Sequence, residues 1–135
     1  EVFSPVVAEG TADVIGSFER IEGLRFAHYL KPGGLAVVST QVLVPVTVSS
    51  GGQDYPKDSI ERLNRVFSNL VTVDADQIAM DLGNIRAASV VVLGAMSKAL
   101  DLPLESWKTS IEECVPPKYI DLNLQAFERG YQASA

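Results

Sequence analysis

The sequence contains few residues of the kinds that build metal centres or disulfide frameworks. It has one cysteine, Cys114, and one histidine, His28. A structural zinc site or an iron–sulfur cluster needs several Cys or His ligands, so this chain alone supplies neither set. A single cysteine also excludes an internal disulfide framework, and we therefore expect a reducing, cytoplasmic setting.

Positive charge and long apolar runs are scarce as well. The 135 residues include 11 Lys and Arg against 17 Asp and Glu, which gives a net charge of −6, and the cations are scattered. Nucleic acids and anionic membrane surfaces need clustered positive charge, so neither is expected as a partner. No apolar run approaches the roughly 20 residues that cross a bilayer. The composition, 47% apolar and 21% charged, is that of one globular domain with a core.

The first part of the chain predicts strands that alternate with a helix. Residues 12–18 and 35–41 have the apolar, β-branched character of strands, and residues 19–30 between them have helical spacing. This order is the crossover unit of a parallel sheet. The Lys-Pro-Gly-Gly run at 31–34 predicts a turn that ends the helix. Pro45 marks the extended segment after the second strand as an edge or a bend.

The middle of the chain gives the clearest amphipathic pattern. Residues 57–70 predict a helix that turns one apolar stripe toward the core. A third short strand follows at 70–74, and then a short helix at 75–82 that Asp74 caps. The predicted stripe of the first helix consists of Ile60, Leu63, Phe67 and Leu70.

The last third of the chain predicts helices alone. Residues 85–100 are apolar on nearly every side and rich in small residues, so we expect a central helix packed on most sides. A further helix is predicted to begin near Pro103, and a last one to cover 116–131 with Gly130 closing it. All these elements together predict a single α/β domain with a Rossmann-like layered fold and a mostly parallel or mixed sheet.

Most candidate reactive groups have a simpler structural explanation. Asp74–Asp76 begins like a calcium loop, but Ala79 occupies the sixth position, where such a loop needs glycine. The Gly-rich run at 31–34 follows a helix, which is the wrong end for phosphate, and the run at 49–52 lacks the Lys-Ser/Thr ending of a phosphate loop. Cys114 is expected to pack against apolar neighbours at a helix end. Catalytic residues and metal ligands are therefore not predicted.

Ser39–Gln41 is the more informative segment. It follows a central strand at its carboxyl end, which is where open α/β sheets place ligands. Thr40 and Gln41 could donate hydrogen bonds to a ligand or to a partner chain, or they could bond the local turn. The sequence favours neither explanation over the other.

Several segments, in order, resemble one enzyme family. They are ADVIGSFERIEGLRFAHYLKPGGLAVVSTQ (12–41), PVTV (45–48), YP (55–56), GNIRAASVVVLGAMSKALDLPLESW (83–107) and VPPKYIDLNLQAFERGY (115–131). This set resembles the gamma domain of 2-oxoacid:ferredoxin (acceptor) oxidoreductases, of the pyruvate and indolepyruvate type. The resemblance implies a Rossmann-like α/β domain inside a complex, associated with anaerobic metabolism, that oxidatively decarboxylates a 2-oxoacid to an acyl-CoA and reduces ferredoxin.

The resemblance also implies how the cofactors are distributed. Thiamine diphosphate and iron–sulfur clusters would belong to other subunits, coenzyme A would be a substrate of the complex, and this chain would bind no cofactor itself. The cofactor-contact or partner-contact candidates are Thr40, Gln41, Asn84 and Arg86. The partners would be the thiamine-binding and iron–sulfur chains, with a homodimer left open. The isolated chain would be inactive and would act in docking and channel shaping.

The sequence departs from the family pattern at several points. The family begins with a strand and a Gly-rich GxGGQG loop into a helix, and no such segment is present in residues 1–135. We therefore expect one gamma-type domain that is a fragment of a longer domain, whose sheet exposes an edge. Ile85 and Ser89 stand where the family favours Pro and Asn, and Ser39 replaces a more usual Asn.

Two other functions remain as alternatives. The run YLKPGGLAVVS resembles the helix–turn–strand of class I methyltransferases, so a methyltransferase fragment is one alternative. A stand-alone Rossmann-like binding module is the other. Which 2-oxoacid the complex uses, and whether coenzyme A contacts this chain, are left open by the sequence.

Overall fold

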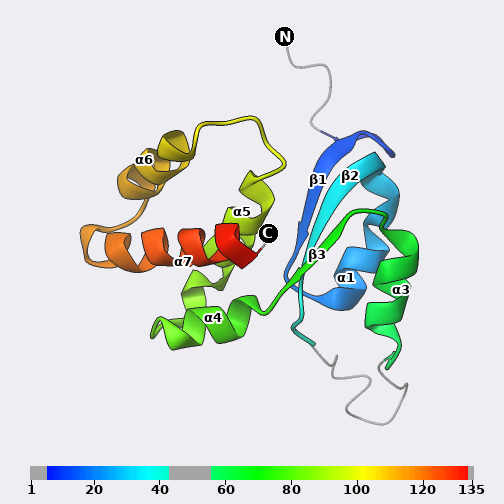
Figure 1. Cartoon of the computed structure of the whole chain (residues 1–135), viewed down its shortest axis with the longest axis horizontal. Coiled ribbons are helices and arrows are strands. Elements are labelled where there is room, and N and C mark those ends of the chain that lie inside the picture. The colour runs from blue at the N-terminus through cyan, green and yellow to red at the C-terminus, as the bar shows by residue number, and fades with distance from the viewer. Residues whose placement is uncertain (1–5, 43–55, 134–135) are drawn as a thin grey trace.

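The computed structural model describes residues 6–42 and 56–133, and these form an α/β fold around a parallel sheet (Figure 1). The described strands are β1 (Ala12–Ser17), β2 (Leu30–Ser39) and β3 (Leu70–Val73). They lie in the order β1-β2-β3, and both pairings are parallel. The predicted fold class is confirmed. The extended segment predicted around Pro45 lies outside the described residues.

Helices cover both faces of the sheet. Helices α1 (Arg20–Arg25) and α3 (Ser59–Val66) pack on one face, and α5 (Ala88–Ser97) packs on the other (Figure 1). Around α5 lie α4 (Ala75–Asp81), α6 (Leu104–Cys114) and α7 (Ile120–Ala133). Three short 3₁₀ turns complete the described elements: η1 (Ala27–Tyr29), η2 (Ile85–Ala87) and η3 (Pro117–Tyr119).

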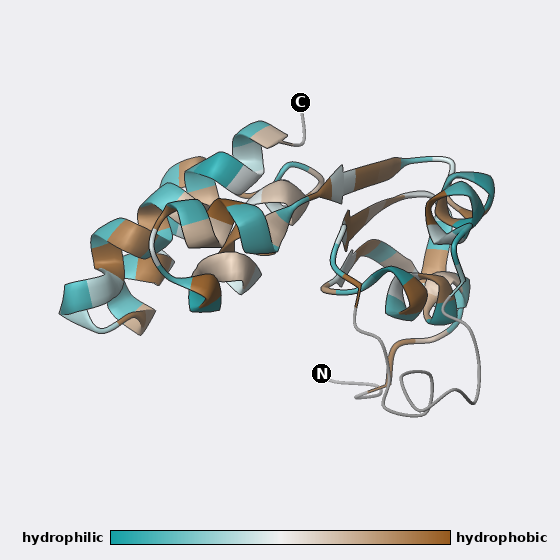
Figure 2. Cartoon of the chain, turned by 90° about the horizontal axis from the view of Figure 1, so that it is seen from below, coloured by the Kyte–Doolittle hydropathy of each residue, from teal (hydrophilic) through white to brown (hydrophobic). Residues whose placement is uncertain are grey.

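The alternation of side chains along β2 produces two cores. Ala36 and Val38 point to the α1/α3 side, where they join the cluster that contains Leu63. Val37 points to the opposite side and joins the cluster that contains Val91 of α5. Successive residues of a strand face opposite sides of its sheet, so a run of apolar residues is what a strand covered on both faces requires. The strands accordingly appear as mainly hydrophobic stretches in Figure 2.

The predicted central helix is confirmed, in two pieces. Residues 85–87 form η2, which runs directly into α5. Val91, Val92 and Ala95 are almost completely buried, whereas Ile85 at the start of the segment is 48% exposed. The segment is therefore enclosed on most sides, as expected, but α5 ends at Ser97, before the predicted end at residue 100. No helix in the described ranges is long and apolar enough to span a membrane.

Helices α5 and α7 touch through their backbones at two glycines. A Cβ atom at Gly94 would lie 2.0 Å from the carbonyl oxygen of Phe127, and one at Gly130 would lie 1.8 Å from the carbonyl oxygen of Val91. Gly130 was predicted to close the last helix, and this is wrong, because α7 continues to Ala133. The glycine is there because the helix crossing leaves no room for a side chain.

The predicted turn at 31–34 is also wrong, because these residues belong to β2. Ala12 pairs with Leu30 and Val14 pairs with Leu35, so Asp13 alone lies opposite the four residues of the run. The extra residues form a bulge, in which Gly33 has a φ of 77°, a conformation that favours glycine. The Pro-Gly-Gly pattern identified a break in regular pairing but did not distinguish a turn from a bulge.

Two smaller expectations also differ from the structure. The helix predicted over 19–30 is shorter, because α1 ends at Arg25 and a separate turn, η1, follows it. Cys114 lies at a helix end, as predicted, but it is exposed. At the start of α3, Asp58 forms an ion pair with Arg62, with Oδ2 and Nε 2.8 Å apart.

An ion pair spans the bulge and gives a pH-dependent prediction. The hydrogen bond from the Lys31 ammonium, assisted by its positive charge, lowers the pKa of the Asp13 carboxyl. Because the folded pKa lies below the unfolded one, the stabilisation exists above the unfolded pKa and disappears as pH falls through the folded pKa. We expect Lys31→Met to raise the pKa of Asp13 toward its ordinary value, measured by NMR titration of the carboxyl. Arg62→Met is the control and should leave the pKa of Asp13 unchanged.

Candidate functional site

The carboxyl end of the sheet is where the fold would place a ligand. β2 is the central described strand, and Ser39 at its end is 1% exposed. The backbone N–H of Thr40 donates to the carbonyl oxygen of Val73, at 2.9 Å, and the N–H of Gln41 approaches Ser39 Oγ, at 3.4 Å. The backbone of this segment is therefore used to continue the pairing with β3 and to form a local turn, while the half-buried side chains of Thr40 and Gln41 lie at the sheet edge.

Both described helices that begin at this edge are capped by their own acidic residues. Glu19, 6% exposed, precedes α1, and its Oε2 accepts hydrogen bonds from the backbone N–H groups of Ile21 and Glu22, at 2.8 and 3.0 Å. Asp74 precedes α4, and its Oδ1 accepts from the N–H of Gln77 at 3.2 Å. A carboxylate at a helix N-terminus satisfies the N–H groups and the dipole that would otherwise attract phosphate. Neither helix therefore resembles a nucleotide site.

The Glu19 cap was not identified from the sequence, although the Asp74 cap was. Ser17 supports the cap from the end of β1, because its Oγ donates to the carbonyl oxygen of Glu19 at 2.7 Å. Glutamate is an uncommon N-cap, and its role here depends on a tight corner between β1 and α1. The spacing of Ser17 and Glu19 at the end of a predicted strand is the only signal in the sequence for this corner.

The other two predicted site residues lie at the opposite end of α4. Asn84 Oδ1 accepts from the backbone N–H of Arg86 at 3.0 Å, and its own N–H donates to the carbonyl oxygen of Ala79 at 3.0 Å. Asn84 therefore shapes the corner between α4 and η2, whereas Arg86 is exposed. Helix α4 begins after β3, which pairs with the end of β2, so the seven residues of α4 lie between the sheet edge and this corner. Thr40 and Gln41 therefore lie at one end of α4 and Asn84 and Arg86 at the other, and none of the four lines a described cavity.

Candidate metal and nucleophile groups are dispersed. Within the described ranges, no group of three or more His, Cys, Asp or Glu side chains is arranged to hold a metal ion. His28 packs on the ring of Tyr29, with the ring centroids 4.2 Å apart, in the turn before β2. Cys114 lies at the end of α6. The two residues therefore belong to different parts of the fold and do not form a reactive pair.

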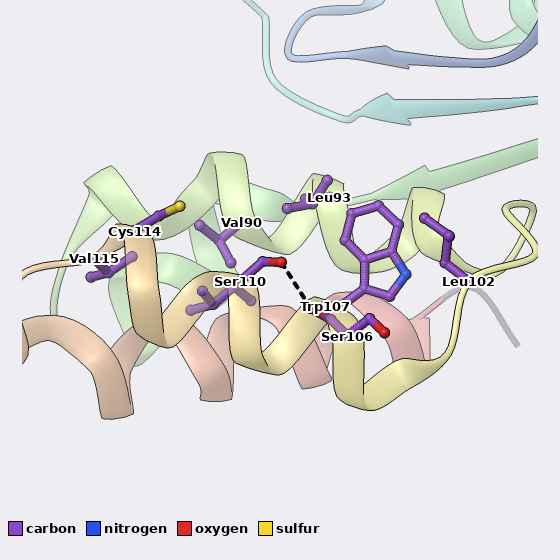
Figure 3. Close-up of a pocket in the computed structure, with 9 residues that line it drawn as sticks. Val90, Leu93, Leu102, Ser106, Trp107, Ser110, Cys114 and Val115 are labelled. Carbon is purple, nitrogen blue, oxygen red and sulfur yellow. Dashed lines mark hydrogen bonds between the residues drawn. The ribbon is translucent and has the colours of Figure 1, made fainter.

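A groove between α5 and α6 is the most apolar of the described cavities. It has a volume of about 350 Å³ (Figure 3). Leu102 is 56% exposed at one end, and Cys114 lies at the other. The indole nitrogen of Trp107 is buried and has no hydrogen-bond acceptor among the described residues. The remaining lining residues are Val90, Leu93, Ser106, Ser110, Ile111 and Val115.

Comparisons with known proteins place the chain in a family. The family model described as pyruvate ferredoxin/flavodoxin oxidoreductase matches residues 2–133. The indolepyruvate oxidoreductase subunit IorB of Thermococcus kodakarensis is 40% identical over 99% of this chain and 69% of that protein. The subunit of the same name from Pyrococcus horikoshii is 38% identical over the same shares of the two chains.

Solved structures share the fold at lower identity. The gamma subunit of a keto/oxoacid ferredoxin oxidoreductase from Geobacter sulfurreducens matches 96% of this chain and 68% of its own, with a TM-score of 0.65 and 20% identity. A 2-oxoglutarate:ferredoxin oxidoreductase from Magnetococcus marinus matches 97% of this chain but only 21% of its own, with a TM-score of 0.63 and 18% identity. From the family match and the curated relatives, the chain belongs to the pyruvate ferredoxin/flavodoxin oxidoreductase family.

Proposed function

We propose that the chain is a non-catalytic, gamma-type component of a cytoplasmic 2-oxoacid:ferredoxin oxidoreductase. The observation that carries this proposal is the 40% identity, over nearly the whole chain, to a protein described as an oxidoreductase subunit. The described residues agree with a non-catalytic role, since both helix ends at the sheet edge are occupied by Glu19 and Asp74. The methyltransferase alternative has no comparable support from the chain's relatives.

The chemistry would then belong to the other components of the complex. Thiamine diphosphate would stabilise the carbanion formed on decarboxylation, and iron–sulfur clusters would carry the electrons, with both held by partner chains. Coenzyme A would accept the acyl group. This chain would contribute shape and contact, with Thr40 and Gln41 at the sheet edge and Arg86 beyond α4 as separate contacts. Asn84 would act through the corner that it caps.

We also propose that the described sheet is part of a larger gamma-type domain. Strand β1 pairs only with β2 among the described strands, so its outer edge has backbone groups that no described strand pairs. An apolar cavity of about 400 Å³ lies along that edge, and exposed Val6, Val7 and Phe26 contribute to its lining. A further strand beside β1 would pair these groups and cover the cavity. Slower amide exchange of β1 in the full complex than in this chain alone would support this proposal.

Reconstitution tests the proposed function. The isolated chain is expected to show no turnover of pyruvate, 2-oxoglutarate or indolepyruvate, because the thiamine diphosphate that would stabilise the decarboxylated intermediate would be held by a partner chain. Co-expression with the thiamine-binding and iron–sulfur chains should give a complex that copurifies through a tag on this chain and reduces ferredoxin. Turnover by the chain alone, or absence of the chain from the purified complex, would contradict the proposal.

A further inference from the structure

Helix α6 is held in place by fewer buried side chains than its neighbours. It lies at the outer end of the helical part of the fold, away from the sheet (Figure 1). Ile111 is the one buried residue among the eleven of α6, whereas α7 buries Ala126, Phe127 and Gly130. The ring of Trp107 provides a second contact, since it stacks beside Phe127 with the centroids 6.1 Å apart. Helices with few buried apolar contacts are the ones that open locally in native proteins.

Open space borders α6 on two sides. The groove of about 350 Å³ separates part of α6 from α5 (Figure 3). A second cavity, of about 180 Å³, lies between Leu104 and Lys108 of α6 and Tyr131 of α7. Close-packed protein interiors leave few voids larger than a water molecule. Helix α6 is therefore loosely packed against both of the helices that support it.

The ends of α6 add little to its stability. Pro103 precedes the helix and makes no side-chain hydrogen bond to its first N–H groups. The last turn contains Glu112 and Glu113 and no basic residue, and acidic side chains at that end oppose the helix dipole. Glu105 in the first turn suits the dipole and pairs with Lys108 at 3.6 Å, but exposed ion pairs contribute little. The helix therefore depends mainly on its packing.

The chain on either side of α6 separates it from the neighbouring helices. Val115, directly after α6, has an extended backbone with φ of −101° and ψ of 137°, as is favoured before a proline, here Pro116. Pro103 at the other end is extended as well, with ψ of 137°. Helices α5 and α7 contact each other directly, at Gly94 and Gly130. Opening of α6 therefore does not require that crossing to break.

The indole of Trp107 weakens the closed position of α6. Its N–H group is buried and has no hydrogen-bond acceptor among the described residues. A buried donor without an acceptor destabilises the state that buries it. Water would supply the acceptor once α6 moved away from α5 and α7. The stack on Phe127 favours the closed position, and the unpaired N–H offsets part of that gain.

We propose that α6 is a local unfolding unit, which detaches and unwinds as a whole while the sheet and the α5/α7 pair stay folded. In the open state Phe127 of α7 would lose its cover on the Trp107 side, and the half-buried Val90 and Leu93 of α5 would become more accessible. Opening therefore turns part of the helical core into accessible surface. The inference concerns this chain alone and does not depend on the proposed function.

Amide hydrogen exchange, resolved by NMR, tests the inference. We expect the amides of residues 108–114 to be at least about tenfold less protected than the buried amides of α5 and α7. They should also share one opening free energy, because they become exposed in the same event. Protection that rises steadily from the ends of α6 to its centre would contradict the inference, because it indicates fraying. Protection equal to that of α7 would contradict it as well.

Leu63→Ala distinguishes local opening of α6 from unfolding of the whole fold. Leu63 is 0% exposed and lies on α3, on the other side of the sheet, so its loss should raise the globally unfolded fraction at least about tenfold. Amides of β2 that need global unfolding should exchange faster by that factor. The amides of α6 should keep their wild-type rates, because α3 stays folded when α6 opens. Equal acceleration of α6 and β2 would overturn the inference.

Two charge substitutions test α6 while the core stays intact. Glu113→Lys replaces an acidic side chain of the last turn with the missing basic one, so exchange of α6 should slow by about two- to fivefold. Glu105→Lys makes the same change of charge in the first turn and should speed exchange by a similar factor. Both residues are exposed and both variants have the same net charge, so each is the control for the other. Equal rates in the two variants would overturn the inference, even if Leu63→Ala does not fold.

Discussion

Replacing Gly130 with alanine is expected to destabilise the chain by about 3 kcal/mol or more. The new Cβ would lie 1.8 Å from the Val91 carbonyl oxygen, and this atom belongs to the backbone, which cannot rotate away as a side chain can. Overpacking usually costs about 1–3 kcal/mol, and a contact this short requires the two helices to separate. The higher helix propensity of alanine returns only about 1 kcal/mol. Urea unfolding followed by circular dichroism measures the difference.

The neighbouring residue provides a matched control. Arg129 is exposed on the same helix, so Arg129→Ala should change the free energy of unfolding by no more than about 0.5 kcal/mol. Gly94→Ala should behave like Gly130→Ala, because its Cβ would meet the Phe127 carbonyl oxygen at 2.0 Å. Wild-type stability in both glycine variants would show that α5 and α7 do not cross at these residues.

Replacing Phe127 with alanine is expected to cost about 3–5 kcal/mol, the range for removing a buried aromatic side chain. Phe127 is 1% exposed and is the largest of the fully buried side chains in the described structure. Its ring stacks beside Trp107, with the centroids 6.1 Å apart, so the substitution also removes support from one wall of the groove. Tryptophan fluorescence during denaturation is a suitable measurement, because Trp107 is the only tryptophan of the chain.

Phe18 is a control for Phe127, because the two residues have the same side chain but Phe18 lies at the surface. Phe18 is 53% exposed at the end of β1, so Phe18→Ala should lower stability by less than about 1 kcal/mol. Similar losses for the two variants would contradict the assignment of Phe127 to the core. A red shift of Trp107 emission in folded Phe127→Ala is also expected, because the indole would lose part of its apolar surroundings.

Patterns within single elements predicted most of the fold. The alternation of strand and helix over residues 12–41 required a parallel pairing, and β1 and β2 form it. The stripe that includes Leu63 and Phe67 placed α3 against the sheet, and both residues are buried. Asp74 was identified as a cap from its position alone. These features depend on local spacing, which a sequence displays directly.

Features that depend on distant residues were harder to predict. Gly130 resembles a helix terminator in the sequence, and only the approach of Val91, thirty-nine positions earlier, gives it another role. The run at 31–34 resembles a turn because its bulge is defined by the pairing with β1. The position of Cys114 beside Val90 was not predicted either, because it depends on how α6 packs beside α5.

The bulge in β2 is also a position at which residues can be inserted or deleted without changing the pairing of the strands. Regular pairing resumes at Leu35 and continues with Ala36 to Val38, which face the two cores, so residues added or removed between Lys31 and Gly33 need not alter that register. Gly33 has open space around it. An epitope or a fluorescent label inserted there would lie on the amino-terminal side of the sheet, away from Thr40 and Gln41 at its carboxyl end.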